Sequence, residues 1–521
     1  MRYLLIILAI GILHPVIAQD TQHFIEFYDN EHTQKRSEGD RIDGKESGLW
    51  TYWYPSGKLS EETAYRRGFI NGKQILYYEN GKKEVESYYT RGLRDSIYIT
   101  WFENGSKREH GYFTGDACDS TWNFWTPTGS SWKTEKCVNG VRTTVNFWDK
   151  DGEQIAEAGN GRLRYYYESG SLREESTLMN GLRNGKTTKY FENGELKYTG
   201  QFAEGVLSGS WKYWYANGAI WKKMSFIDGK IDGAYQLFYS NGELSRTGTY
   251  KNNFRDGKWE AFFENGDLDW KGSYEQGKEQ GHWEVYFFNG NLESEGEYSN
   301  ALKDGTWTYY FESGKKYRSG NYLKDKEDGH WTSWWENGQV FTRGTYATGL
   351  EEGLWESFFE TGKWKDKGSF TGGKLDGKWE GWFESGSPKY AGQWDIGMKT
   401  GEWMLWYPKK IIREKGIYKA NLKEGAWEYF TEYGKLESAG SYENGSKSGK
   451  WIFNYPQGQI KRAQSFKHDR PDGSSVVYNE KGIVVNASTF KEGRLHGKYQ
   501  KFSEEGKLKT TVQYKNGVRV K

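Results

Sequence analysis

The chain has 521 residues, of which 18% are aromatic and only 35% hydrophobic. Lys and Arg total 73 against 71 Asp and Glu, a net charge of +2, which argues against nucleic acid as the main partner because such proteins carry a one-sided basic surface. The same balance gives no support for binding to acidic membrane surfaces.

The first 18 residues have the pattern of a secretory signal peptide. Arg2 precedes an apolar stretch at 3–13, and Val16 and Ala18 form a small-residue cleavage pattern. The apolar stretch is shorter than the roughly 20 residues of a membrane-spanning helix, so an uncleaved anchor is the weaker alternative. We therefore expect export to the periplasm, the outer membrane periphery or the cell exterior.

Residues 19–47 are polar, show few repeat features and are expected to cap the first strand. Residues 48–160 then carry a divergent form of a 24-residue repeat, in which Ser96 and Ser120 stand where later copies have glycine. The last unit of this block is irregular and shortened to 18 residues before Gly161. A kink or bulge in one continuous sheet explains the irregularity, and we favour it over the alternative of a hinge or a local site.

The two cysteines, Cys118 and Cys137, lie 19 residues apart in one hairpin unit of the divergent block. The strand register given below places Cys137 opposite Ser120, two residues after Cys118. A diagonal disulfide with a structural role is therefore expected in an exported protein. Two independent thiols are the alternative.

Residues 161–521 carry the regular form of the repeat. Glycine recurs every 24 residues from Gly161 to Gly497, fifteen times in all, and eight consecutive copies from Gly257 to Gly425 read Gly-x-Trp. Counted from this glycine as offset 0, offsets 5 and 6 are aromatic, offsets 8 and 9 are commonly Asn-Gly or Ser-Gly, and offset 15 is usually glycine. A constant period of this length indicates one supersecondary unit copied end to end.

Each unit is predicted to be a β-hairpin, because an aromatic run, a glycine-containing turn and a second short apolar run follow one another. One hairpin has too few rings to fold alone and needs neighbours to complete their burial. The predicted fold is therefore all-β, an elongated array of stacked 24-residue hairpins in one long twisted antiparallel sheet.

The expected register places offset 2 opposite offset 15, so that the indole of Trp259 covers Gly272 within one hairpin, as Trp283 would cover Gly296. The same face would hold Phe263 with Leu268. The offset-5 rings would point to the other face, among polar side chains.

This row of offset-5 rings is the candidate binding site. Rings at about 10 Å spacing would suit sugars, extended peptides or another protein surface, whereas coiling or dimerisation of the sheet would bury them. The row consists of Phe262, Tyr286, Tyr310, Trp334, Phe358, Trp382, Trp406 and Phe430.

No residue pattern indicates catalysis, a metal site or a cofactor. His282 and His330 are two periods apart, about 20 Å, which is too far to share a metal. No nucleophile elbow, phosphate-binding loop or dinucleotide fingerprint occurs. The carboxylates are copied from unit to unit, whereas an active site is a unique arrangement, so we expect a protein that is not an enzyme.

The unit G-x-W-x-x-[aromatic]-[aromatic]-E-N-G-x-L-x-x-x-G-x-Y-x-x-G resembles the MORN repeat in its bacterial variant form, over nearly the whole chain after residue 18. The resemblance implies stacked hairpins and a scaffold or membrane-proximal role. Some bacterial relatives are labelled as antitoxins of toxin–antitoxin pairs, although a cytosolic antitoxin needs no export signal.

Three functions remain open from the sequence. The first is an exported, non-catalytic scaffold that binds protein partners or assembles with itself. The second is a cell-wall or glycan-binding module that uses the offset-5 rings. The third is an antitoxin or immunity role.

Overall fold

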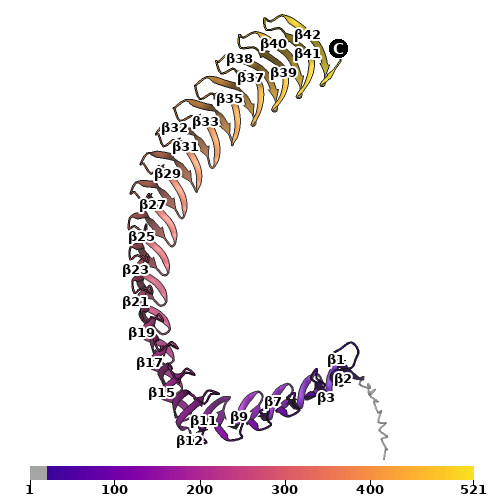
Figure 1. Cartoon of the computed structure of the whole chain (residues 1–521), viewed down its shortest axis with the longest axis vertical. Helices are drawn as coiled ribbons and strands as arrows, with labels where there is room; N and C mark the ends of the chain where they lie inside the picture. Colours follow the sequence, from indigo (N-terminus) through magenta and orange to yellow (C-terminus); the bar gives the residue numbers. More distant parts are fainter. Residues whose placement is uncertain (1–19, 521) are drawn as a thin grey trace, which may run out of the picture. The chain divides into compact units, whose positions relative to one another are not determined.

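The computed structural model describes residues 20–520, and every regular element in that range is a β-strand. The strands group into two compact units. Unit 1 holds the described residues up to Glu243 together with Tyr250–Asn253, and unit 2 holds Leu244–Thr249 and the residues from Phe254 onward. Within each unit the strands follow one another in chain order (Figure 1).

The strands of unit 1 are β1 Thr21–Phe27, β2 Lys35–Ile42, β3 Lys45–Trp53, β4 Leu59–Arg66, β5 Phe69–Tyr77, β6 Lys83–Thr90, β7 Leu93–Trp101, β8 Lys107–Thr114, β9 Ala117–Trp125, β10 Ser131–Val138, β11 Val141–Trp148, β12 Gln154–Glu157, β13 Asn160–Tyr166, β14 Leu172–Met179, β15 Leu182–Tyr190, β16 Leu196–Ala203, β17 Val206–Trp214, β18 Ile220–Ile227 and β19 Lys230–Phe238. Strand β20, Leu244–Lys251, has residues in both units.

The strands of unit 2 are β21 Phe254–Phe262, β22 Leu268–Glu275, β23 Lys278–Tyr286, β24 Leu292–Ser299, β25 Leu302–Tyr310, β26 Lys316–Leu323, β27 Lys326–Trp334, β28 Val340–Ala347, β29 Leu350–Phe358, β30 Trp364–Thr371, β31 Lys374–Trp382, β32 Pro388–Asp395, β33 Met398–Trp406, β34 Ile412–Lys419, β35 Leu422–Phe430, β36 Leu436–Glu443, β37 Ser446–Asn454, β38 Ile460–Lys467, β39 Arg470–Tyr478, β40 Val484–Lys491, β41 Arg494–Phe502, β42 Leu508–Lys515 and β43 Val518–Arg519.

Each 24-residue period forms one hairpin, as the pair β21 and β22 illustrates. A strand of 9 residues is followed by a strand of 8, the two pair antiparallel, and β22 then pairs antiparallel with β23 of the next hairpin. The prediction of an all-β fold built from stacked 24-residue hairpins is confirmed. The expected signal peptide lies outside the described residues.

Two different turns alternate along the chain, and both require left-handed backbone. The turn inside a hairpin is closed by Gly266 N–H donating to the carbonyl of Phe263 at 2.9 Å, with Gly266 at φ 89°. The turn between hairpins places Gln276 and Gly277 at φ 50° and 84°. Two consecutive left-handed residues match the right-handed twist of the flanking strands, which explains why these connections are short and repeated.

The glycine at offset 0 is a third left-handed position, at φ 76° in Gly257. Ser96 and Ser120, which replace it in the divergent block, also have positive φ, 86° and 57°. The backbone requirement therefore persists where the residue type does not, and it accounts for the strict glycine period.

The predicted register is confirmed at Trp259, which pairs with Gly272, and at Gly257, which pairs with Tyr274. The expected contact of Phe263 with Leu268 is wrong. A register shift after Ala261 places Phe262 opposite Leu268. Phe263 instead opens the turn, where its N–H donates to the carbonyl of Asp267 at 2.8 Å.

The expected cover of Gly272 by the indole of Trp259 is also wrong, because the indole on Gly272 belongs to Trp283 in the next hairpin. A Cβ on Gly272 would lie 2.2 Å from Cδ2 of Trp283. The cause is a second register shift, since Lys271 pairs with Glu284 but Ser273 pairs with Gln280. The extra residues, with Gly281 at φ 69°, turn the indole back over the preceding strand.

This contact recurs between successive hairpins in both units, always between a glycine and the tryptophan 11 residues later. Each tryptophan therefore joins its hairpin to the one before it, which is how neighbouring repeats complete each other's burial. The pairs are Gly39–Trp50, Gly111–Trp122, Gly200–Trp211, Gly248–Trp259, Gly272–Trp283, Gly296–Trp307, Gly320–Trp331, Gly344–Trp355, Gly368–Trp379, Gly392–Trp403, Gly416–Trp427 and Gly440–Trp451.

The segment 19–47, expected to cap the first strand, contains strands of its own. Strand β1 pairs with β2, β2 pairs with β3, and Trp50 covers Gly39 as in the regular repeats. The shortened unit before Gly161 is accommodated by the four-residue strand β12, which pairs with β11 and β13. The sheet of unit 1 is therefore continuous across the irregular unit.

Candidate functional site

The sheet has two faces that differ in chemistry. The Trp face is the one that carries Trp259, Ala261, Trp270, Gly272 and Tyr274 in β21 and β22, together with the equivalent residues of other hairpins. Trp259 is 1% and Ala261 3% exposed, whereas Glu260 between them is exposed. The opposite face, the polar face, carries the charged residues that alternate with them along each strand.

The candidate offset-5 row lies on the polar face, as expected, but its rings are not exposed. Phe358 is buried and the other seven are half-buried. Lys271 illustrates the surroundings, since its Nζ lies 5.9 Å from the ring centre of Tyr286 and 2.8 Å from a carboxylate oxygen of Glu284. Charged side chains therefore cover part of each ring, and less of it is left for a ligand than the sequence suggested.

Tyr310 shows how members of the row are held. Its hydroxyl donates to Oε1 of Glu295, in the preceding hairpin, at 2.6 Å. Burial and this hydrogen bond raise the pKa of Tyr310 to about 12. The hydroxyl thus stays protonated and links two hairpins.

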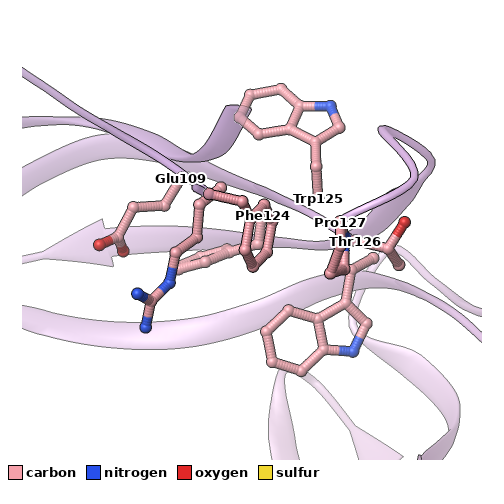
Figure 2. Close-up of a pocket in the computed structure, with 8 residues that line it drawn as sticks. Glu109, Phe124, Trp125, Thr126 and Pro127 are labelled. Atoms are coloured by element: carbon pink, nitrogen blue, oxygen red, sulfur yellow. The ribbon is translucent and has the colours of Figure 1, made fainter. Parts of the chain in front are cut away.

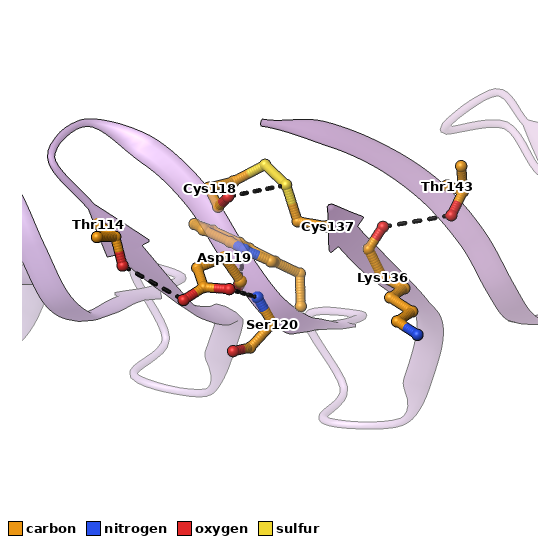
Figure 3. Close-up of a disulfide and its surroundings, with 8 residues drawn as sticks. Thr114, Cys118, Asp119, Ser120, Lys136, Cys137 and Thr143 are labelled. Atoms are coloured by element: carbon orange, nitrogen blue, oxygen red, sulfur yellow. Dashed lines mark hydrogen bonds between the residues drawn. A yellow bond between two sulfur atoms is a disulfide. The ribbon is translucent and has the colours of Figure 1, made fainter. Parts of the chain in front are cut away.

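Cys118 on β9 and Cys137 on β10 are joined by a disulfide, with their Cα atoms 5.9 Å apart (Figure 3). Cys137 pairs with Ser120, as the expected register requires. Cys137 is 3% exposed and packs in a cluster with Phe113, Trp122 and Phe124. The disulfide thus lies in a packed part of unit 1, where it cross-links two strands.

A pocket of about 450 Å³ lies close to this region, between the hairpins of the divergent block (Figure 2). Its walls are mostly aromatic, with one arginine and one carboxylate among them. The sequence analysis did not single out these residues, although Pro127 and Trp132 depart from the repeat pattern and could have marked them. The lining residues are Phe102, Arg108, Glu109, Phe124, Trp125, Thr126, Pro127 and Trp132.

Cations lie over the rings of the Trp face in unit 2. Nζ of Lys303 is 4.1 Å from the ring centre of Trp307 and donates to the hydroxyl of Tyr309 at 2.8 Å. Burial lowers the pKa of Lys303. Lys423 repeats the arrangement at 3.9 Å from Trp427 and 2.8 Å from the hydroxyl of Tyr429. Each such contact is a cation–π interaction that places positive charge beside an aromatic surface.

The Trp face also holds a groove of about 570 Å³ in unit 2, here called the Trp-face groove, with walls from β20 to β25. Sequence reasoning assigned the binding role to the other face and missed it. A cation at offset 13 or two residues before the repeat glycine was the available signal, because both positions flank the buried rings. The lining residues are Arg246, Arg255, Trp270, Tyr274, Trp283, Val285, Glu293, Ser294, Tyr298, Lys303, Trp307 and Tyr309.

Across residues 20–520, no three His, Cys, Asp or Glu side chains are grouped so that they could hold a metal ion. His282 lies 3.0 Å from Oε1 of Glu297. The same range contains no helix that is long and apolar enough to cross a membrane.

The family model of the MORN repeat variant matches ten segments of the chain. These segments fall in both units and follow the hairpins described above. They are residues 46–66, 70–90, 160–180, 183–204, 207–228, 231–252, 279–300, 303–324, 327–347 and 495–516. A search of curated proteins found no match.

Among solved structures, the chain is similar to the one titled "Crystal Structure of TcdB2-TccC3-Cdc42", with 9% identity, 95% of this chain and 31% of that chain covered, and a TM-score of 0.13. A Photorhabdus luminescens Tc holotoxin pore gives 10% identity, 94% and 28% coverage, and a TM-score of 0.12. This chain spans about a third of the length of the structures it matches. At such TM-scores the likeness carries no argument.

Proposed function

The chain belongs to the MORN repeat family, in its variant form, and on this premise we propose that it is an exported, non-catalytic repeat scaffold that binds protein partners or assembles with itself. The observation that carries the proposal is the tryptophan-to-glycine contact copied between hairpins. It repeats one arrangement of rings and cations along one face of each unit. A repeated surface suits the binding of extended partners.

Two features support export and the absence of catalysis. The disulfide between Cys118 and Cys137 suits an oxidising compartment, as does the signal-like composition of the first 18 residues. The side chains that recur on both faces are copied from hairpin to hairpin, whereas catalysis needs one unique set of groups.

The scaffold role is tested by purifying the full chain from its native envelope and identifying what remains bound. The identified partner is then mixed with the purified chain to measure its stoichiometry and affinity, while light scattering measures self-association. We expect a stoichiometric protein partner or a defined oligomer. A monomer that binds no protein, or a turnover abolished by one substitution, contradicts the proposal.

Glycan binding by the offset-5 row is the second candidate, and the ring contacts on the polar face bear on it. Trp364 lies 4.5 Å from Phe358 and 6.1 Å from Trp382 between ring centres, which gives a short apolar strip. If glycans bind there, Trp334→Ala combined with Trp382→Ala abolishes retention on peptidoglycan. Unchanged retention in that variant contradicts this candidate. An antitoxin-like role instead requires a toxin that the chain neutralises.

A further inference from the structure

Two buried hydrogen-bond donors in the Trp-face groove lack a partner in the chain. They are Nε1 of Trp283 and Nε of Arg246, and both residues line the groove. Trp283 is 7% exposed. A buried donor without an acceptor costs about 1–3 kcal/mol, so native proteins nearly always satisfy such groups. Both donors are therefore available to a ligand in the groove.

Trp283 is an exception among the tryptophans that cover a glycine, because the others donate Nε1 to a backbone carbonyl. In the neighbouring hairpins, Trp259 donates to the carbonyl of Thr249 and Trp307 to that of Glu297, both at 3.0 Å. The remaining bonds of this kind are formed by Trp50, Trp122, Trp211, Trp331, Trp355, Trp379, Trp403, Trp427 and Trp451.

Arg246 differs in the same way from Arg318, which occupies the same repeat position three hairpins later. Nη2 of Arg318 lies 2.6 Å from Oε1 of Glu327, and its guanidinium lies 4.2 Å from the ring centre of Trp331. The chain thus supplies a carboxylate to Arg318. The guanidinium of Arg246 lies 5.9 Å from the ring centre of Trp270, and its Nε has no acceptor.

The two donors belong to one connected aromatic surface. Arg246 lies over Trp270, and the rings of Trp270 and Trp283 stack with centres 5.1 Å apart. Tyr274 and Tyr298 flank Trp283 edge-on, at 5.2 and 5.6 Å. A ligand in the groove therefore meets flat apolar surface as well as two hydrogen-bond donors.

The charge and length of the groove indicate the ligand. Its walls carry three cations, Arg246, Arg255 and Lys303, against one carboxylate, Glu293. Its lining residues come from six successive strands, β20 to β25, and five spacings of about 4.8 Å give about 24 Å, the length of about seven residues of extended peptide. A small carboxylic acid would fill only part of this length.

We propose that the Trp-face groove binds an extended acidic segment of a protein partner, with a carboxylate that accepts hydrogen bonds from Nε of Arg246 and Nε1 of Trp283. Apolar side chains of the segment pack on the indole and phenol rings beside the carboxylate. The proposal rests on the scaffold function and names the surface and the partner chemistry.

The test uses a fluorescent peptide, Glu-Leu-Asp-Phe-Asp-Leu-Glu, and its amide counterpart, Gln-Leu-Asn-Phe-Asn-Leu-Gln, titrated into the full chain. We expect the acidic peptide to bind at least about tenfold more tightly than the amide peptide. Arg246→Gln and Trp283→Phe, which remove the donors and keep much of the side-chain volume, are expected to weaken the acidic peptide by a similar factor.

Matched controls are Arg318→Gln and Trp331→Phe, in the hairpins where the same positions already have partners. These variants are expected to change affinity by less than about twofold. Circular dichroism and thermal unfolding of each variant verify that it is folded. Failure of the native chain to bind the acidic peptide, equal binding of the amide peptide, equal loss in the controls, or preference for a glycan oligomer overturns the proposal.

A partner found by envelope purification separates this proposal from the scaffold function. If that partner binds Arg246→Gln and Trp283→Phe as well as the native chain, the groove assignment is wrong and the scaffold function stands. If no partner or oligomer exists, the scaffold function fails, while the peptide titration still reports on the groove.

Discussion

At the residue scale, the packing between hairpins depends on a conserved total volume rather than on tryptophan itself. Where the glycine position holds a larger residue, the tryptophan position holds a smaller one. Thr63 pairs with Gln74, Ser176 with Thr187, and Gln464 with Ser475. Thr63, Ser176, Thr187, Gln464 and Ser475 are all at most 4% exposed. Close packing of the interior leaves space for one large and one minimal side chain, or for two of middle size.

This volume rule predicts compensation between Gly416 and Trp427, which pair directly and have Cβ-to-indole clearance of only 2.2 Å. Gly416→Ser alone is expected to cost about 1–3 kcal/mol by overpacking, and Trp427→Thr alone about 3–5 kcal/mol by leaving a cavity. Both changes together recreate the pair of Ser176 and Thr187. We expect the double variant to be more stable than the sum of the single effects by about 0.5–3 kcal/mol, measured by urea unfolding. Strictly additive effects would contradict the rule.

At the element scale, each hairpin depends on its left-handed positions. The offset-0 residue holds positive φ and lies in the register shift that turns the next tryptophan over the preceding glycine. Side chains cap the turns between hairpins, as where Oδ2 of Asp472 accepts from the N–H of Glu492 at 2.9 Å. The turn, the shift and the indole contact thus form one local device.

Ser96→Gly is expected to stabilise unit 1, since serine at φ 86° has a strained backbone. Relief of about 1–2 kcal/mol of left-handed strain is partly offset by the about 0.5–1 kcal/mol that glycine costs in the unfolded chain. We expect a net gain of up to about 1 kcal/mol and a higher Tm. Ser210→Gly, an exposed strand position in the same unit, is the control and is expected to lose stability. A lower Tm for Ser96→Gly would contradict the strain argument.

Asp472→Ala removes the acceptor for the Glu492 amide and is expected to cost about 1 kcal/mol. The change leaves a turn donor to water in an exposed connection, so the effect remains local. Hydrogen exchange at Glu492 should become faster, while exchange in the neighbouring strands stays slow. Asp472→Asn keeps an acceptor oxygen and is expected to retain most of the protection. Equal exchange in the two variants would show that the carboxylate does not cap the turn.

At the scale of the whole molecule, each hairpin contacts chiefly its immediate neighbours in the chain. Stability in such arrays is approximately a sum of hairpin terms and nearest-neighbour terms. A local change is therefore felt over a few strands and not throughout the chain. The disulfide between β9 and β10 is the sharpest place to test this, because it is confined to one hairpin.

Cys118→Ser combined with Cys137→Ser opens a loop of 19 residues. The loss of the cross-link is expected to destabilise the hairpin by about 3 kcal/mol through the entropy of the unfolded chain. Hydrogen exchange measured by mass spectrometry should rise in β8 to β11 and stay unchanged from β30 onward. Reduction of the native chain should reproduce the effect. Exchange that rises throughout the chain would contradict nearest-neighbour stability.

The sequence by itself determined the repeat unit, the all-β fold and most of the strand register, because glycine, turn and aromatic positions are set by local backbone geometry. The pairing of Trp259 with Gly272 followed from strand alternation alone. The candidate row at offset 5 was placed on its face for the same reason. Its half-burial could not be read from the sequence, since charged side chains such as Lys271 lie across the rings.

Only the tertiary structure decided which hairpin each indole joins and which face offers unsatisfied groups. The register shift opposite Gly272 assigns that glycine to Trp283, and no pattern within a single 24-residue unit specifies a contact between two units. The free donors of Arg246 and Trp283 are likewise a property of neighbouring strands. Local sequence fixes dihedral angles and alternation, whereas hydrogen-bond satisfaction depends on groups that only the stacked hairpins bring together.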